Sequence, residues 1–141
     1  MQRIVIGHDF TLPPERVFAY MSEHENLGDL FGAEVKRIRD GTDGSRNGVG
    51  SVRSLKVGPF PAFEETVTEV VPNELIRYRI TMGSPLRDHE GSMRFTPNPD
   101  GGTHLHYEIS FRGAVPGLGA VIAPGLRRNI VKGLGRVDSA A

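Results

Sequence analysis

The last segment of the chain, Pro116 to Val137, combines an apolar face with poor intrinsic helix propensity. Five glycines lie in this stretch, and Pro124 interrupts it. Each glycine costs about 1 kcal/mol relative to alanine in a helix interior. The apolar residues recur every four positions, which places them on one face of a helix: Leu118, Ile122, Leu126, Ile130 and Leu134. Because propensity is poor, tertiary packing must hold this helix, and the rest of the chain must supply an apolar surface for it.

Most of the preceding chain has the two-residue alternation of β-strands, bounded by turn residues. A first strand, Arg3–Phe10, is followed by two short helical segments, Pro13–Glu23 and His24–Phe31. The six later strands are predicted at Glu34–Arg39, Val49–Val57, Ala62–Val71, Leu75–Met82, Asp88–Thr96 and Thr103–Arg112. Short connections rich in Gly, Pro, Asn and Asp favour an antiparallel meander. We therefore expect an α+β fold in which a curved antiparallel sheet of about seven strands wraps around the long C-terminal helix.

Length and composition limit the classes of protein to consider. The chain has 141 residues and no long linker or repeat, so a single domain over residues 1–141 is expected. Seventeen basic residues balance seventeen acidic ones, which argues against a nucleic-acid-binding protein. There is no cysteine, which excludes disulfides and thiolate chemistry. No stretch has the length and hydrophobicity of a signal peptide or membrane span. We expect a cytoplasmic protein, monomeric or weakly homodimeric, that does not insert into membranes.

Six short motifs carry a resemblance to a known superfamily. In order they are Leu12–Phe18, Gly50–Arg53, Glu69–Pro72, Tyr78–Ile80, Pro85–Gly91 and Gly101–Tyr107. Their order and spacing resemble the START/Bet v 1-like (SRPBCC) superfamily, in particular its polyketide cyclase/dehydrase-like branch, over nearly the whole chain. The resemblance implies a helix-grip fold with a cavity between the sheet and the terminal helix. It does not imply a reaction, since the superfamily includes lipid carriers, hormone receptors and cyclases.

The sequence departs from the superfamily pattern in two places. Phe31 stands near the end of the second short helix, where many relatives have a Trp. The C-terminal helix is richer in glycine and ends sooner than is common in the superfamily. Both departures bear on the shape of the expected pocket.

Strand alternation indicates which side chains face the cavity. Tyr78, His89 and Tyr107 each share a strand face with apolar residues. We therefore expect these three side chains to line the cavity from the sheet. From the helix, the expected lining residues are Leu118, Ile122, Leu126 and Ile130.

The third and fourth strands add two charged candidates. The more apolar face of the third strand carries Arg53, with Lys56 on the opposite face. In the fourth strand we favour Glu65 as inward-facing, with Glu64 in its place if a bulge shifts the register. Because an isolated buried charge is costly, an arginine and a carboxylate in one apolar cavity should pair.

These residues leave two functions open. The favoured one is non-catalytic binding of a small hydrophobic or amphipathic molecule, as a carrier or sensor. The alternative is a cyclase- or dehydratase-type enzyme acting on a polyketide-like carbonyl substrate. There, His89 with a pKa near neutrality and a neighbouring Glu65 would act as general base or acid, while Tyr78 or Arg53 stabilises an enolate oxygen. Neither function calls for a cofactor.

The loop Gly58–Ala62 resembles the gate loop of plant abscisic acid receptors, a distant branch of the same superfamily. Phe60 occupies the position that closes over the ligand in that loop. An exposed Phe at a stiff, proline-flanked tip is unfavourable unless it covers something. The alternative is an ordinary hairpin turn with Phe60 packed on the sheet edge.

Three potential zinc ligands alternate along the last strand: His104, His106 and Glu108. Nitrogen and oxygen donors of this kind bind zinc. They lie on the face opposite the apolar one, however, so we expect surface pairing with neighbouring strands and no metal site.

Overall fold

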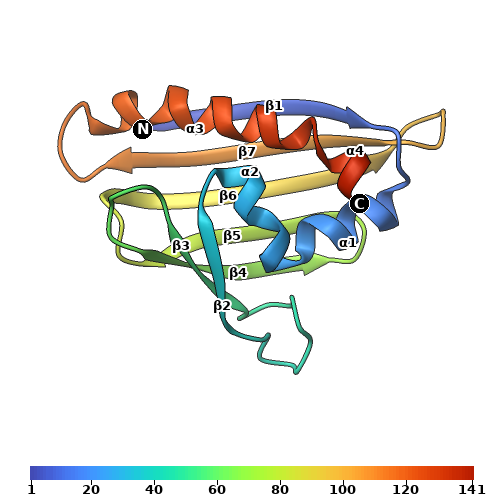
Figure 1. The fold of residues 1–141 in the computed structure, drawn as a ribbon, viewed down its shortest axis with the longest axis horizontal. Helices are drawn as coiled ribbons and strands as arrows, with labels where there is room; N and C mark the ends of the chain where they lie inside the picture. Colours follow the sequence, from blue (N-terminus) through green and yellow to red (C-terminus); the bar gives the residue numbers. More distant parts are fainter.

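The computed structural model describes residues 1–141 and contains a single sheet with helices along one face (Figure 1). The strands are β1 (Gln2–Phe10), β2 (Glu34–Arg39), β3 (Val52–Lys56), β4 (Phe63–Val71), β5 (Leu75–Met82), β6 (Leu86–Pro97) and β7 (Thr103–Gly113). The helical elements are α1 (Pro14–Ser22), the 3-10 helix η1 (His24–Asn26), α2 (Leu27–Phe31), α3 (Leu118–Leu134) and α4 (Val137–Ala140). The predicted α+β helix-grip fold is confirmed.

The seven strands form one antiparallel sheet in the order β1-β7-β6-β5-β4-β3-β2. Strands β2 to β7 are a meander, and β1 joins the far edge beside β7. The chain therefore crosses from one edge to the other through α1, η1 and α2. On this path Phe18 packs edge-on against Phe95 of β6, and Phe31 lies against Tyr78 of β5. The short helices thus cover part of the face that also carries the hydrophobic core.

Helix α3 lies along β1 and β7, and its two halves differ in packing (Figure 1). In the C-terminal half, Ile130 and Leu134 are fully buried. Gly133 lies so close to α2 that a Cβ there would meet the backbone of Leu30. The apolar residues of the N-terminal half are only half-buried: Leu118, Ile122 and Leu126. None of the helices combines the length and hydrophobicity needed to cross a membrane.

Two predicted elements, the third strand and the terminal helix, have a boundary that differs from the structure by three residues. Strand β3 begins at Val52 and not at Val49, because Gly50 has a left-handed φ of +88° and the backbones of Gly50 and Ser51 bond instead to Val67. The terminal helix begins at Leu118, runs through Pro124 without a break and stops at Leu134. Pro124 is exposed, so the backbone carbonyl that loses its hydrogen bond there remains open to water.

The placement of Tyr78 depends on Gly91, its direct partner on β6. A Cβ on Gly91 would overlap the Tyr78 ring, which is only 1% exposed and has no room to move. We expect Gly91→Ala to lower the free energy of unfolding by about 1–3 kcal/mol, as measured by urea denaturation. The control is Gly125→Ala in α3, where a Cβ meets nothing within 4 Å and alanine should add about 0.5–1 kcal/mol. Equal stability of the two variants would contradict the packing described here.

Candidate functional site

A row of side chains crosses the concave face of the sheet from β3 to β6. Arg53 pairs in register with Glu65, Glu65 with Ile80, and the backbone N–H of Ile80 bonds to His89. The three polar members are buried, with exposures of 2% for Arg53, 5% for Glu65 and 8% for His89. The preferred register is confirmed, since Glu65 faces inward and Glu64 is half-buried, with a bulge between them.

Arg53 and Glu65 form a buried ion pair, as the sequence predicts. Arg53 Nε donates to Glu65 Oε1 at 2.9 Å, and the guanidinium lies 4.8 Å from the centre of the Tyr78 ring. Burial raises the pKa of the Glu65 carboxyl, and the charge of Arg53 opposes this effect. Arg53 Nη2 is buried and has no hydrogen-bond partner. The pair therefore carries one charged donor that the protein leaves unused.

Tyr78 and Tyr107 close the cluster on the side of β7. Their hydroxyls hydrogen-bond to each other, and both side chains are almost completely buried. Burial raises the pKa of both phenols well above the usual value. Both hydroxyls therefore stay protonated near neutral pH and form a polar, uncharged side of the cluster.

The protonation state of His89 differs from the one that the sequence suggests. Its Nδ1 accepts the backbone N–H of Ile80 at 3.1 Å, so the proton of the neutral ring lies on Nε2. Burial, with the charge of Arg53 as the second cause, lowers its pKa to about 4. The expected pKa near neutrality is wrong, because the charged ring would be desolvated beside a cation. At neutral pH His89 offers an N–H donor and not a general base.

The other predicted lining residues lie on α3, which packs along β1 and β7, and in the β3–β4 loop. Ile130 belongs to the fully buried core, whereas Leu118, Ile122 and Leu126 form the half-buried face of α3. Phe60 is 63% exposed, so it neither covers the cluster nor packs on the sheet edge. Its loop is held by Lys56 Nζ, which donates to the carbonyls of Gly58 and Phe60.

Two surface hollows lie away from the row. The larger, about 630 Å³, is polar and lies where η1 and α2 meet the end of α3, with Glu25, Asp29 and Arg136 in its wall. The smaller, about 170 Å³, lies at the start of β1 and α3. Neither is lined by a residue of the row, so Arg53, Glu65 and His89 are closed off from both.

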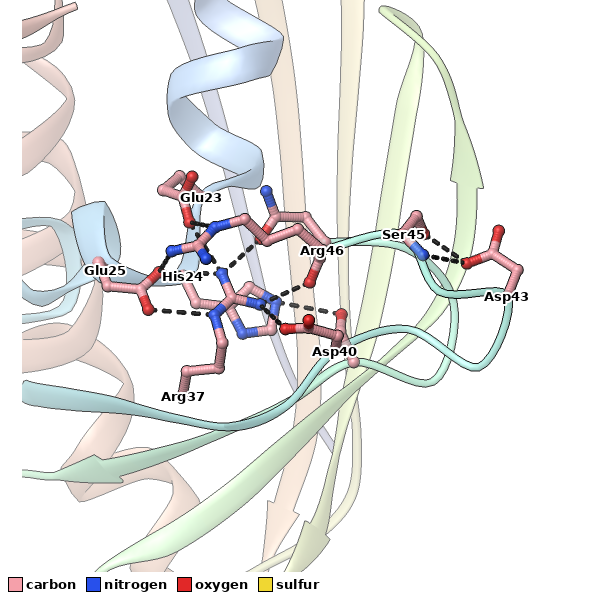
Figure 2. Close-up of polar contacts among 10 residues, drawn as sticks. Glu23, His24, Glu25, Arg37, Asp40, Asp43, Ser45 and Arg46 are labelled. Carbon is pink, nitrogen blue, oxygen red and sulfur yellow. Dashed lines mark hydrogen bonds and ion pairs between the residues drawn. The ribbon is translucent and has the colours of Figure 1, made fainter.

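A second polar cluster joins η1 to the β2–β3 loop (Figure 2). Arg37 donates to Glu23, Glu25 and Asn47, and Arg46 donates to Glu23. Hydrogen bonding from Arg37 is the main cause that lowers the pKa of Glu25 to about 2. No motif indicated this cluster, because its members come from η1 and the residue before it, from β2 and from the β2–β3 loop, which meet only in the folded chain. Its role is to fix the β2–β3 loop.

His24 lies behind these residues and contacts a serine. Its Nε2 is 3.1 Å from Ser51 Oγ, and both side chains are completely buried. A histidine beside a serine is typical of nucleophilic catalysis, but here no substrate could reach the hydroxyl. The contact is structural.

The potential zinc ligands on β7 are engaged in pairs on the outer face. His104 Nδ1 lies 2.8 Å from Asp9, and His106 Nε2 lies 2.9 Å from Glu108. No three His, Asp or Glu side chains converge to hold a metal ion.

The ion pair predicts an asymmetric response to mutation. Arg53→Met leaves Glu65 buried without a counter-charge and should cost about 3–5 kcal/mol of stability, measured by urea denaturation at pH 7. The double variant R53M/E65L removes both charges and should recover most of that loss. Because lone Glu65 favours its protonated form, the deficit of R53M should also shrink as the pH is lowered. A double variant as unstable as R53M would contradict a coupled pair.

The state of His89 predicts both a tautomer and an acid response. Nitrogen NMR should show a neutral Nε2–H ring at pH 7 that titrates near pH 4. Since the unfolded histidine titrates near 6.5, the unfolded chain binds the proton first as the pH falls. Stability from neutral His89 is therefore full above about pH 6.5 and should drop by about 3 kcal/mol by pH 4. His89→Asn should flatten this slope in urea denaturation; a charged ring at pH 6 would contradict the geometry.

Solved structures of bacterial proteins have the same fold. A START superfamily protein from Mycobacterium smegmatis aligns with a TM-score of 0.80 and 18% identity, covering 99% of each chain. A protein from Chromobacterium violaceum gives 0.72 and 17%, covering 100% of this chain and 98% of its own. The Aha1 dimer from Colwellia psychrerythraea gives 0.71 and 13%, covering 98% and 97%. At these identities the likeness shows the fold alone.

No curated protein matches the sequence. A family model described as "Polyketide cyclase / dehydrase and lipid transport" matches residues 1–141. The match covers the whole chain, and the START-like fold and the six sequence motifs agree with it. The protein therefore belongs to the polyketide cyclase/dehydrase and lipid transport family and has a START-like fold.

Proposed function

We propose that the protein binds a small hydrophobic or amphipathic molecule between the concave face of the sheet and α3, as a carrier or sensor. The supporting observation is the unused Nη2 of Arg53, a charged donor buried among apolar side chains. A buried donor without a partner costs about 1–3 kcal/mol or more when charged. A ligand oxygen at this point would remove that cost, while the surrounding apolar side chains would hold a hydrocarbon skeleton.

The N-terminal half of α3 is the proposed entrance. The cluster is closed in this conformation, so a ligand needs a movable wall. Leu118, Ile122 and Leu126 are only half-buried, whereas the C-terminal half is anchored on α2. A movement confined to the first half would expose the cluster without disturbing the fully buried core.

Exposed apolar side chains at the same end of the sheet support this entrance. The β5–β6 and β7–α3 loops meet there, where the N–H of Ala114 donates to the carbonyl of Pro85 at 2.7 Å. Met82 and Val115 are 63% and 57% exposed on these two connections. An apolar rim is unfavourable in water and gives an apolar ligand a first contact.

The geometry favours binding over acid–base catalysis. The alternative reaction requires His89 or Glu65 to exchange a proton with a substrate near neutral pH. His89 Nδ1 already accepts a backbone N–H, and Glu65 Oε1 already accepts from Arg53. The remaining Nε2–H of His89 and Nη2 of Arg53 suit the orientation of a ligand.

A matched pair of tryptophan variants tests the proposed space. The neutral fluorophore N-phenyl-1-naphthylamine should bind the wild-type protein with enhanced emission. Ile122→Trp fills the sheet-facing side of α3 and should weaken this binding at least about tenfold, or about 1.4 kcal/mol. Val121→Trp, at a neighbouring position that is 77% exposed, should leave it unchanged.

A thermal shift assay supplies an independent measurement. A ligand present at 100 times its dissociation constant should add about 2.7 kcal/mol to the free energy of unfolding. Absence of any fluorophore binding, or an equal effect of the two variants, would contradict a site beneath α3.

A further inference from the structure

The ionised groups within the proposed site are limited to one pair. Arg53 and Glu65 carry opposite charges 2.9 Å apart. The other titratable groups that face them are Tyr78, Tyr107, His89 and His24, all of which are neutral near pH 7 because burial disfavours their charged forms. A ligand entering this space therefore meets a site of zero net charge.

Two N–H donors of the site have no partner within the protein. Arg53 Nη2 is unused, and His89 carries its proton on Nε2 because Nδ1 accepts from Ile80. One of the two tyrosine hydroxyls donates to the other. Both Arg53 and His89 lie against the Tyr78 ring, at 4.8 Å and 5.5 Å from its centre. An oxygen acceptor placed beside this ring would have N–H groups near it.

We propose that Glu65 determines which ligand charge the site accepts. Because Glu65 already neutralises Arg53, the site binds an uncharged molecule whose carbonyl or hydroxyl oxygen accepts a hydrogen bond from Arg53 Nη2. It rejects the carboxylate of the same carbon skeleton. This inference rests on the binding function proposed above. It identifies Glu65 as a specificity-determining residue and names the ligand class as neutral, oxygen-bearing lipids or ketides.

The energetic argument compares two ligands that differ only in their head group. A carboxylate brings a third charge into a closed site, and removing an ion from water costs several kcal/mol. Its attraction to Arg53 is offset by repulsion from Glu65. A ketone oxygen accepts the same hydrogen bond with a far smaller loss of hydration. The neutral ligand should therefore bind at least about tenfold more tightly than the carboxylate.

The fold imposes this arrangement on Glu65. Its direct pairing with Arg53 across β3 and β4 puts both side chains on the same face, and the regular alternation of β4 places Glu65 on the buried side with Val67. Glu64, one residue earlier, is half-buried and pairs in register with Ser54 and Met82. The neighbouring glutamates therefore differ in their relation to the site although they are adjacent in sequence.

The test compares 2-dodecanone with dodecanoate at pH 7.5, by displacement of N-phenyl-1-naphthylamine from the full chain. Wild-type protein should bind the ketone at least tenfold more tightly than the carboxylate. Glu65→Gln keeps an acceptor for Arg53 Nε but removes the negative charge, so the order should reverse. Glu64→Gln removes one negative charge outside the site and should keep the wild-type order. Glu65→Leu provides a second variant with Arg53 uncompensated, in case E65Q does not fold.

The possible outcomes distinguish a failure of charge selection from a failure of the proposed ligand binding. If the wild-type protein binds the ketone and dodecanoate equally well, or if E65Q and E65L keep the wild-type order, ligand binding stands and charge selection is overturned. If E64Q reverses the order as well, the effect comes from net charge and the role of Glu65 is overturned. If neither ligand nor fluorophore binds, the proposed function itself fails and charge selection falls with it.

Discussion

The buried ion pair between Arg53 and Glu65 governs how the concave face is built. Two charges can remain in an apolar space only if they meet at short range and in good geometry. The sheet provides this by direct pairing across β3 and β4, which puts Arg53 and Glu65 on the same face. The Tyr78 ring lies beneath the guanidinium, and only a glycine at position 91 leaves room for that ring. The register of β3 and β4 and the glycine at position 91 therefore support one interaction.

Stability alone does not explain why this pair is present. Apolar residues of similar volume are often as stabilising as a buried ion pair, or more so, and here the pair also leaves Arg53 Nη2 without a partner. The pair lies on β3 and β4, whereas α3 packs along β1 and β7, and its large side chains are fully buried only at Ile130 and Leu134. An unsatisfied buried donor is understandable if a ligand occupies that position for part of the time. This reasoning connects the ion pair to the binding function.

The sequence predicted the architecture well because the architecture depends on local patterns. Period-two alternation located all seven strands and placed Arg53, Glu65, Tyr78 and Tyr107 on the buried face. It did not predict the state of His89, which depends on an irregular stretch of β6 between Arg87 and Glu90 that brings Nδ1 to the N–H of Ile80. It also missed the contact of His24 with Ser51, because these residues lie 27 positions apart and meet only through the β2–β3 loop. Tertiary contacts of this kind have no periodic signature.

The C-terminal helix illustrates how one element can meet two demands. Its glycines weaken it throughout, but their effects differ with position. Gly133 allows close contact with α2 and so anchors the last turns, whereas Gly125 has nothing near the position of a Cβ and only lowers helix propensity. Gly119 in the first turn is buried and packs against Gln2 and Gly113, but the side chains of the N-terminal half are half-buried or exposed. Segments with few buried side chains open locally at lower free energy than the global unfolding. The same helix can complete the core with one half and, with the other, form a movable wall of the space proposed for the ligand.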